Sequence, residues 1–113
     1  MVEIKGSTII MTQGDTVVIR VLINDIDGSV YEPAQGDTLR FAMKRNYTDE
    51  KPILVKDIPI STMELILNPI DTKNLDSGSA KGRYKYDIEL TKADGSIDTV
   101  IPRADIIILE EVL

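Results

Sequence analysis

Two pairs of neighbouring carboxylates are the residues of this chain that could carry out acid–base chemistry. Asp25 with Asp27 and Glu110 with Glu111 form these pairs, and paired carboxylates in a cleft can share the acid and base roles of a hydrolase. The spacing places the first pair in a predicted turn and the second near the end of the sequence, so neither is brought into a cleft. The chain also has no His and no Cys, which removes the commonest general base, the thiol nucleophile and the usual transition-metal ligands. We therefore expect no enzyme activity and no cofactor.

Oxygen-rich turns could instead suggest a calcium site. The run Asn-Asp-Ile-Asp-Gly spans Asn24 to Gly28, and a second acidic loop carries Asp49 and Glu50. A helix-flanked calcium loop needs Gly at its sixth position and Glu at its twelfth, and this spacing is absent here. Irregular acidic loops at the ends of a β-sandwich can still bind calcium, although the same residues are typical of hairpin turns. We favour the turn interpretation and predict no metal site.

Two tyrosines, Tyr84 and Tyr86, could form an exposed platform for a sugar or a peptide. We favour a core position for both, with Tyr84 packed at the sandwich edge like the residue of a tyrosine corner and Tyr86 directed inward. Phe41 is expected in the core as well. The chain has no Trp, which weakens a carbohydrate-binding interpretation because such modules hold sugars by aromatic stacking.

Repeated turn signals indicate the elements that position these residues. Gln-Gly-Asp-Thr occurs at Gln13 to Thr16 and again at Gln35 to Thr38, each time directly before an alternating apolar segment. Gly supplies unusual backbone angles, Asp can hydrogen-bond its own turn, and the β-branched Thr favours an extended start. Further turns are expected at Asp27-Gly28-Ser29 and Asp94-Gly95-Ser96. The pattern predicts an all-β domain.

Short alternating segments fill the chain between these turns, which predicts a two-sheet β-sandwich of seven to nine antiparallel strands. Residues 69–82 hold few large apolar side chains and suit one helical turn crossing an end of the domain. The expected strands are Ser7 to Thr12, Thr16 to Asn24, Val30 to Glu32, Thr38 to Arg45, Ile53 to Asp57, Met63 to Asn68, Gly82 to Lys92, Ile97 to Ile101 and Asp105 to Val112.

Three of these strands alternate clearly enough to predict which side chains face the core. Their other side chains, such as Arg40, Lys44, Lys85 and Asp87, should face outward. The inward residues are Val17, Ile19, Val21 and Ile23 in one strand, Leu39, Phe41 and Met43 in the next, and Tyr84, Tyr86, Ile88 and Leu90 in the third.

Length and charge exclude several classes of protein. The 113 residues, of which 42% are apolar, predict a single globular domain over residues 1–113. Thirteen basic residues against 19 acidic ones give a net charge of −6, and the basic residues are scattered, so nucleic acid is not an expected partner. We expect no signal peptide and no membrane span, because the apolar runs are only a few residues long.

Several strands have apolar residues on both faces, which one two-sheet core cannot accommodate. The surplus lies in Val17-Val18-Ile19, Val21-Leu22-Ile23, Leu65-Ile66-Leu67 and Ile106-Ile107-Ile108-Leu109. A loop or the helical crossover could cover the second face, but we favour a partner subunit. We predict that the contact residues are Val18, Leu22, Ile107 and Leu109.

The order of these motifs resembles a known family. Gly14-Asp15-Thr16 precedes a strand, a turn follows at Asp27-Gly28, a strand reads LRFAMKR, a crossover contains Leu75 and Gly78, and GRYKYDI leads into an Asp-Gly hairpin. Together these motifs, which extend over roughly residues 10–112, resemble the immunoglobulin-like domain of phage baseplate and tail proteins. The similarity is to the amino-terminal domain of the baseplate upper protein of phages of Gram-positive bacteria. The second Gln-Gly-Asp-Thr departs from that pattern, and the chain lacks the fibre or receptor-binding parts of long members.

The resemblance implies an immunoglobulin-like sandwich that is a non-enzymatic structural component of a phage or prophage tail. Such a protein would be assembled in the bacterial host cytoplasm, and its partners would be other tail or baseplate proteins or further copies of itself as a homo-oligomer. The alternative is a cell-surface or secreted adhesion module that binds carbohydrate or a host protein through its loops. A signal sequence would favour that alternative, and none is expected here.

Overall fold

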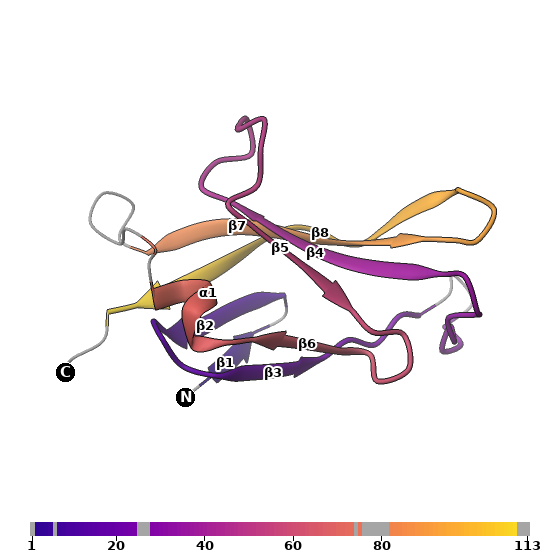
Figure 1. The fold of residues 1–113 in the computed structure, drawn as a ribbon, viewed down its shortest axis with the longest axis horizontal. Coiled ribbons are helices and arrows are strands. Elements are labelled where there is room, and N and C mark those ends of the chain that lie inside the picture. The colour runs from indigo at the N-terminus through magenta and orange to yellow at the C-terminus, as the bar shows by residue number, and fades with distance from the viewer. Residues whose placement is uncertain (1, 6, 25–27, 74, 76–81, 111–113) are drawn as a thin grey trace.

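The computed structural model describes residues 2–5, 7–24, 28–73, 75 and 82–110 (Figure 1). Within these residues the chain is mostly β-structure with one short helix, as the sequence predicts. The elements are β1 (Val2–Lys5), β2 (Thr8–Thr12), β3 (Val17–Arg20), β4 (Thr38–Lys44), β5 (Leu54–Ile58), β6 (Glu64–Leu67), α1 (Pro69–Lys73), β7 (Arg83–Thr91) and β8 (Ile97–Leu109).

The strands form two sheets, one of six strands in the order β1-β2-β8-β7-β4-β5 and one of two strands, β3 and β6. Neighbouring strands are antiparallel except for β2 and β8, which are parallel and place Ile9 opposite Ile106 and Thr12 opposite Leu109. The prediction of antiparallel strands is therefore wrong for this pair. Parallel neighbours need a long connection, and here nearly the whole domain separates them.

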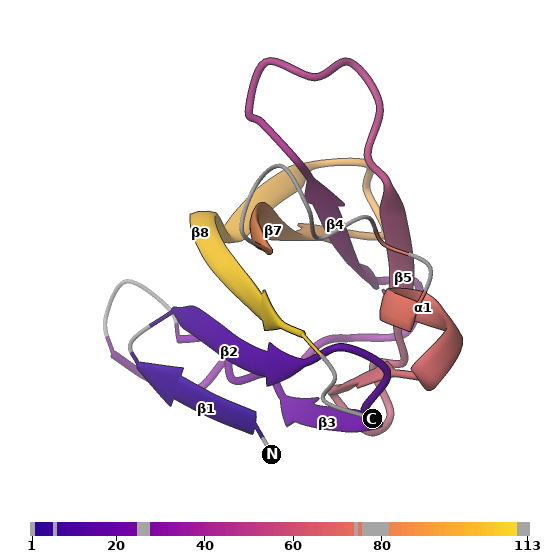
Figure 2. The ribbon, with the colours of Figure 1, turned by 90° about the vertical axis from the view of Figure 1, so that its left-hand side faces the viewer.

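The six-stranded sheet bends from one layer of the molecule into the other. In both Figure 1 and Figure 2, β8 leaves the layer of β7 and β4 and reaches the layer of β3, where β1 and β2 also lie. The core fills the space between the layers, and the predicted inward residues of the three alternating strands are buried there, except Ile19, which is partly buried against the core. The buried apolar residues are Ile9, Met11, Val17, Val21, Ile23, Leu39, Phe41, Met43, Ile58, Leu65, Leu67, Tyr84, Tyr86, Ile88, Leu90, Ala104, Ile106 and Ile108.

The strand predicted from Thr16 to Asn24 is shorter in the structure, where β3 ends at Arg20. Beyond this point the backbone bonds to other segments: the Val21 amide donates to the Met63 carbonyl at 2.8 Å, and the Tyr31 amide donates to the Ile23 carbonyl at 2.8 Å. The strand predicted from Val30 to Glu32 is reduced to a single bridge between Val30 and Asn24. The alternation of apolar residues predicted which face of this segment is buried, but it did not predict how far the β3–β6 hydrogen-bond ladder extends.

The last two predicted strands, Ile97 to Ile101 and Asp105 to Val112, are one continuous strand, β8, in the structure. Proline cannot donate a ladder hydrogen bond, but it is tolerated at a bulge, which is where Pro102 lies. Tyr86 pairs with Ala104 and Ile88 with Ile101, so two residues of β8 lie opposite one residue of β7. This arrangement is a β-bulge, and it lets the strand continue through the proline.

Two short elements, β1 and α1, complete the fold. β1 was not predicted; it is only four residues long and pairs with β2 in a hairpin. The helical turn predicted within residues 69–82 is confirmed as α1, which has Asn68 before it, Pro69 in its first turn, and Asp71 accepting the Asn68 amide at 2.7 Å. Pro is well suited to this position, and the bond from the Asn68 amide to the Asp71 carboxylate caps the start of the helix. Gly78, expected to close the segment, lies outside the described residues.

The two Gln-Gly-Asp-Thr repeats hold different parts of the fold together. In the first, the Gln13 side-chain amide donates to the carbonyls of Thr72, Lys73 and Leu75, each at 3.0 Å. The Gly14 amide donates to the buried Thr72 hydroxyl at 2.8 Å. Because the last carbonyls of a helix have no partner within it, the turn before β3 thereby caps the end of α1.

In the second repeat the aspartate is the important residue. Asp37 is buried and its carboxylate accepts bonds from the Tyr31 hydroxyl at 2.7 Å, the Ala34 amide at 2.9 Å and the Ala93 amide at 3.2 Å. The Tyr31 bond, followed by the backbone bonds, lowers the pKa of this carboxyl below its ordinary value of 3.8 because each donor stabilises the charged form. The side chain ties the turn before β4 to the β7–β8 hairpin.

Candidate functional site

The carboxylate pairs considered for acid–base chemistry fall largely outside the described residues. Asp25, Asp27 and Glu111 belong to that undescribed part, and Glu110 lies exposed after β8. The second acidic loop is described, and there Asp49 forms hydrogen bonds within the loop. Its carboxylate accepts the Asn46 amide at 3.1 Å, and its carbonyl accepts the Lys44 amino group at 2.7 Å. Within the described part of the chain, no three acidic side chains gather in a metal-binding group.

The tyrosines considered as a ligand platform are core residues, as predicted. Tyr84 is fully buried and Tyr86 is 4% exposed, and the Tyr86 ring lies 5.4 Å from the Phe41 ring, centroid to centroid. The Tyr86 hydroxyl donates to the carbonyl of Ser7. Burial raises the pKa of Tyr86 to about 12, because the phenolate would lose its hydration. Neither ring is available to stack on a ligand.

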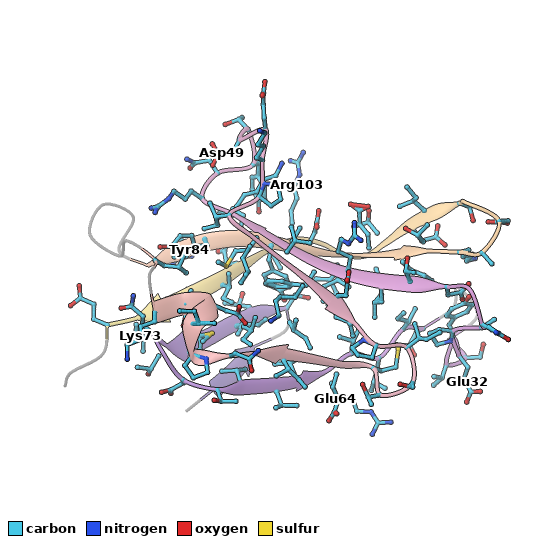
Figure 3. The ribbon with its side chains drawn as sticks, viewed as in Figure 1. Glu32, Asp49, Glu64, Lys73, Tyr84 and Arg103 are labelled. Carbon is cyan, nitrogen blue, oxygen red and sulfur yellow. The ribbon has the colours of Figure 1, made fainter. Side chains whose placement is uncertain are left out.

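An exposed apolar strip lies on the outer face of the two-stranded sheet. We call this group, formed by Val18, Leu22 and Ile66, the β3–β6 strip. Their side chains are 51%, 70% and 42% exposed, and Val18 lies directly opposite Ile66 across the ladder. Glu64, two positions before Ile66 on the same strand, points away from the core at the lower side of Figure 3. Two predicted contact residues, Val18 and Leu22, therefore lie on one face, and Ile66 adds to them.

The other two predicted contact residues lie on a different sheet. Ile107 and Leu109 alternate with the buried Ile106 and Ile108 on β8, so they face the outer side of the six-stranded sheet. Ile107 is half-buried opposite Ile10 on β2, whereas Leu109 is 48% exposed. The predicted contact residues are therefore divided between β8 of the six-stranded sheet and the β3 segment.

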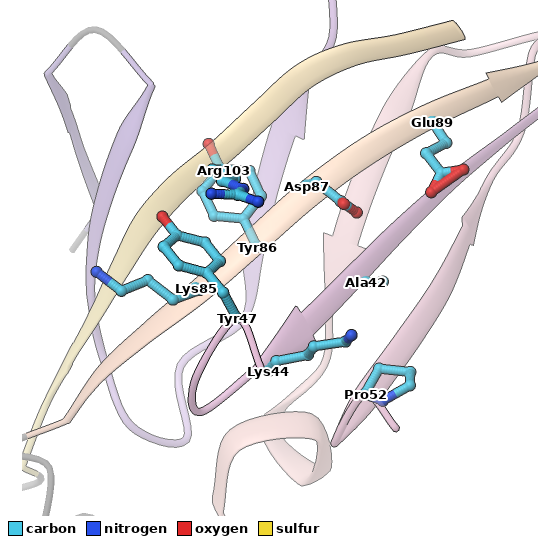
Figure 4. Close-up of a pocket in the computed structure, with 9 residues that line it drawn as sticks. All are labelled: Ala42, Lys44, Tyr47, Pro52, Lys85, Tyr86, Asp87, Glu89 and Arg103. Atoms are coloured by element: carbon cyan, nitrogen blue, oxygen red, sulfur yellow. The ribbon is translucent and has the colours of Figure 1, made fainter. Parts of the chain in front are cut away.

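A third surface feature was not predicted from the sequence. A hollow of about 250 Å³ lies on the outer face of β4, β7 and β8, beneath the β4–β5 loop (residues 45–53) that stands out from the upper layer in Figure 1. Figure 4 shows Lys85 and Arg103 beside the Tyr47 ring, with Lys44 next to Lys85 on the neighbouring strand, and we call Lys44, Tyr47, Lys85 and Arg103 the cationic hollow. The alternation predicted that Lys44 and Lys85 face outward, but only the register between strands and the bulge at residues 102–103 bring the set together.

No protein-family model, no curated protein and no solved structure matches the chain. In the described part of the chain, no helix is both long and apolar enough to span a membrane.

Proposed function

We propose that this protein is a non-enzymatic structural module that acts by assembling with other proteins. The observation that carries this proposal is the β3–β6 strip. Val18, Leu22 and Ile66 are exposed while their neighbours Val17, Leu65 and Leu67 are almost completely buried. Val18 and Ile66 are directly opposite each other, and Leu22 lies beyond the end of β3, past the Arg20–Glu64 pair. Exposed apolar side chains on the outside of a sheet are characteristic of protein–protein contact sites.

The strip can supply the free energy of such a contact. Removing apolar surface from water contributes roughly 25 cal/mol per Å², so one large side chain that becomes buried contributes about 1.5–3 kcal/mol. Three such side chains could form the apolar part of an interface that also contains polar residues such as Arg20 and Glu64. Arg20 and Glu64 are themselves opposite each other in the ladder.

The proposal includes an immunoglobulin-like sandwich and a place in a phage or prophage tail, in contact with baseplate proteins or with further copies of the chain. The order of motifs from Gly14-Asp15-Thr16 to GRYKYDI supports this assignment. The arrangement of two sheets around one core is compatible with it. The surfaces on β3 and β6 and on the end of β8 are the contact sites that such a component would use.

The test is the solution mass of the chain, measured by light scattering during size exclusion at several concentrations. The exposed-strip variant carries Val18→Asp and Ile66→Asp, which place two charges in the proposed interface. The matched control carries Val55→Asp on β5, where the side chain is 45% exposed on the other sheet. We expect the native chain and the control to form the same oligomer and the strip variant to be monomeric.

A parallel variant, Ile107→Asp with Leu109→Asp, tests the second predicted surface in the same measurement. Dissociation by this variant alone would move the interface to β8. A native chain that is monomeric at every concentration would contradict self-assembly, and a strip variant with an unchanged mass would contradict the strip as the contact.

A further inference from the structure

The cationic hollow concentrates positive charge around one aromatic ring. The Arg103 guanidinium carbon lies 5.0 Å from the Tyr47 ring centroid and the Lys85 amino nitrogen lies 5.3 Å from it. Tyr47 is 42% exposed, so one part of the ring holds the cations while another part faces solvent (Figure 4). Contacts of this kind are only weakly stabilising when exposed, which does not account for bringing two cations to one ring with a third lysine beside them.

The strand register places like charges next to each other, which destabilises the sheet. Lys44 and Lys85 occupy directly opposite positions on β4 and β7, and like charges opposite each other destabilise a sheet. The nearest carboxylate, Asp105, is shared: it pairs with Lys85 at 2.5 Å and with Arg83 at 2.8 Å. Among the described residues, Arg103 has no ion-pair partner. Although the chain has a net charge of −6, the end of the hollow at Arg103 is therefore available to an anionic group.

The bulge in β8 is what places Arg103 in the hollow. Arg103 has a φ of 23°, one of two positive φ values at non-glycine residues in the described chain, and it lies in the bulge opposite Asp87. Bulges redirect side chains, and sparsely populated backbone angles persist where the surrounding structure holds them. Figure 3 shows the Arg103 side chain standing above the upper layer, near the loop that carries Asp49.

The same hollow has an acidic end. Asp87 and Glu89 follow Lys85 at alternate positions on the outward side of β7 and line the hollow with it. Ala42 lies opposite Asp87. Because its side chain is short, it does not fill the hollow between the basic and the acidic residues. These carboxylates would repel a phosphate dianion, whereas a ligand with both a carboxylate and a cation would satisfy both ends.

The spacing of the two ends matches an extended polypeptide. Alternate residues of a strand lie about 6.6 Å apart on the same side, which is the spacing of Lys85 and Asp87 along β7. We propose that the cationic hollow binds an extended segment of a partner protein in which an acidic and a basic residue are two positions apart. The acidic side chain lies between Lys85 and Arg103 beside Tyr47, and the basic side chain faces Asp87 and Glu89.

This inference rests on the proposed assembly function and names the chemistry of one partner. The test uses amide NMR spectra of the isotope-labelled full chain, titrated with the peptide acetyl-Ser-Glu-Thr-Lys-Ser-amide at low salt. We expect saturable shifts of the Tyr47, Lys85 and Arg103 signals. Arg103→Gln should weaken the peptide affinity by about tenfold, since a charge-assisted bond is lost. Arg20→Gln, which removes the same charge from the exposed face of the other sheet, should leave the affinity unchanged.

Three results would overturn the inference. Equal binding of a peptide with Gln in place of Glu would exclude carboxylate recognition. Tighter binding of inorganic phosphate than of the peptide would show a simple anion site. Equal affinity of the native chain and Arg103→Gln, with Tyr47→Ala giving the same answer, would place any binding elsewhere.

The solution mass of the same samples separates this inference from the proposed function. The strip variant with Val18→Asp and Ile66→Asp should lose assembly and keep peptide binding, because its substitutions lie on the other sheet. A chain that assembles but does not bind the peptide refutes the hollow, and a chain that binds the peptide but never assembles refutes self-assembly through the strip.

Discussion

At the scale of single residues, Gly82 shows how little freedom the start of β7 allows. Its φ is +71°, and a Cβ built on it would lie 2.0 Å from the Ile108 carbonyl oxygen. The Gly82 carbonyl in turn accepts the Ile108 amide at 2.7 Å, so neither backbone can move away without breaking this bond. The residue is required both for its backbone angle and for the close approach of β8.

We expect Gly82→Ala to lower the free energy of unfolding by about 3 kcal/mol or more, because strain and a backbone clash combine. The matched control is Gly95→Ala in the β7–β8 turn, where φ is +92° and no atom lies within 4 Å of the added Cβ. Gly95→Ala should cost about 1–2 kcal/mol, the penalty of the left-handed backbone alone. Urea unfolding of both variants measures the difference, and equal losses would show that the Ile108 contact has no effect.

Tyr86 gives the chain a predicted sensitivity to base. Burial raises its folded pKa to about 12 from an ordinary 10.0, so the unfolded chain loses this proton first as the pH rises. The stabilisation is therefore complete below pH 10 and is lost as the pH rises from 10 towards 12. We expect the urea concentration at the midpoint of unfolding of the native chain to fall between pH 10 and pH 12.

Tyr86→Phe is the variant that tests this pH dependence. It should cost about 1 kcal/mol at neutral pH, because the Ser7 carbonyl loses its donor, and it should show a smaller fall between pH 10 and 12. A fall of the same size in the variant would assign the base sensitivity to other groups.

At the scale of elements, the two Gln-Gly-Asp-Thr repeats form a natural matched pair. Gln13 bonds to three carbonyls at the end of α1, whereas Gln35 is exposed in its turn. We expect Gln13→Ala to lower the free energy of unfolding by about 1–2 kcal/mol and to speed amide exchange in α1, since the carbonyls lose their partner. Gln35→Ala should stay within about 0.5 kcal/mol.

Urea unfolding and hydrogen exchange of these two variants measure the contrast. Equal stability of the two would mean that water replaces the Gln13 amide at no cost. The identical repeats predict identical turns from the sequence alone, and only the tertiary partners, Thr72 in one case and Ala93 in the other, separate their roles.

The positions of the strands along the chain could be predicted from the local pattern, but which strands pair with each other could not. The alternation in β4 and β7 correctly identified the buried faces because period two reports which side of a strand is apolar. It carries no information on which strand lies next to which, so the parallel pairing of β2 with β8 and the pairing of Lys44 with Lys85 were missed. The bulge was missed for a related reason: it is defined by the register between β7 and β8, which the local pattern does not report.

At the scale of the whole molecule, two surfaces of opposite chemistry face away from the core. The β3–β6 strip lies outside the two-stranded sheet, and the cationic hollow lies outside the six-stranded sheet. A module with one apolar and one charged contact on its two outer faces can join two different neighbours at once. Of these surfaces, the apolar one could be partly predicted, since Val18 and Leu22 follow from alternation alone.

The two contacts should respond to salt in opposite directions. Self-association through the strip is opposed by the net charge of −6, so screening should strengthen it between roughly 0.05 and 0.5 M salt. Binding of the Glu-Thr-Lys peptide to the hollow depends on attraction between charges and should weaken over the same range. Light scattering and NMR titration at matched salt concentrations measure both trends, and parallel trends would contradict the division into an apolar and a charged contact.

The parallel pairing of β2 with β8 also determines when this protein can finish folding during its synthesis. Ile9 and Met11 are synthesised nearly a hundred residues before their partners Ile106 and Ile108. At about 5–20 residues per second, the delay is on the order of ten seconds. During that time the edge of β2 that pairs with β8 has no native neighbour, so a nascent chain of this protein is exposed to mispairing at this edge until β8 has been made.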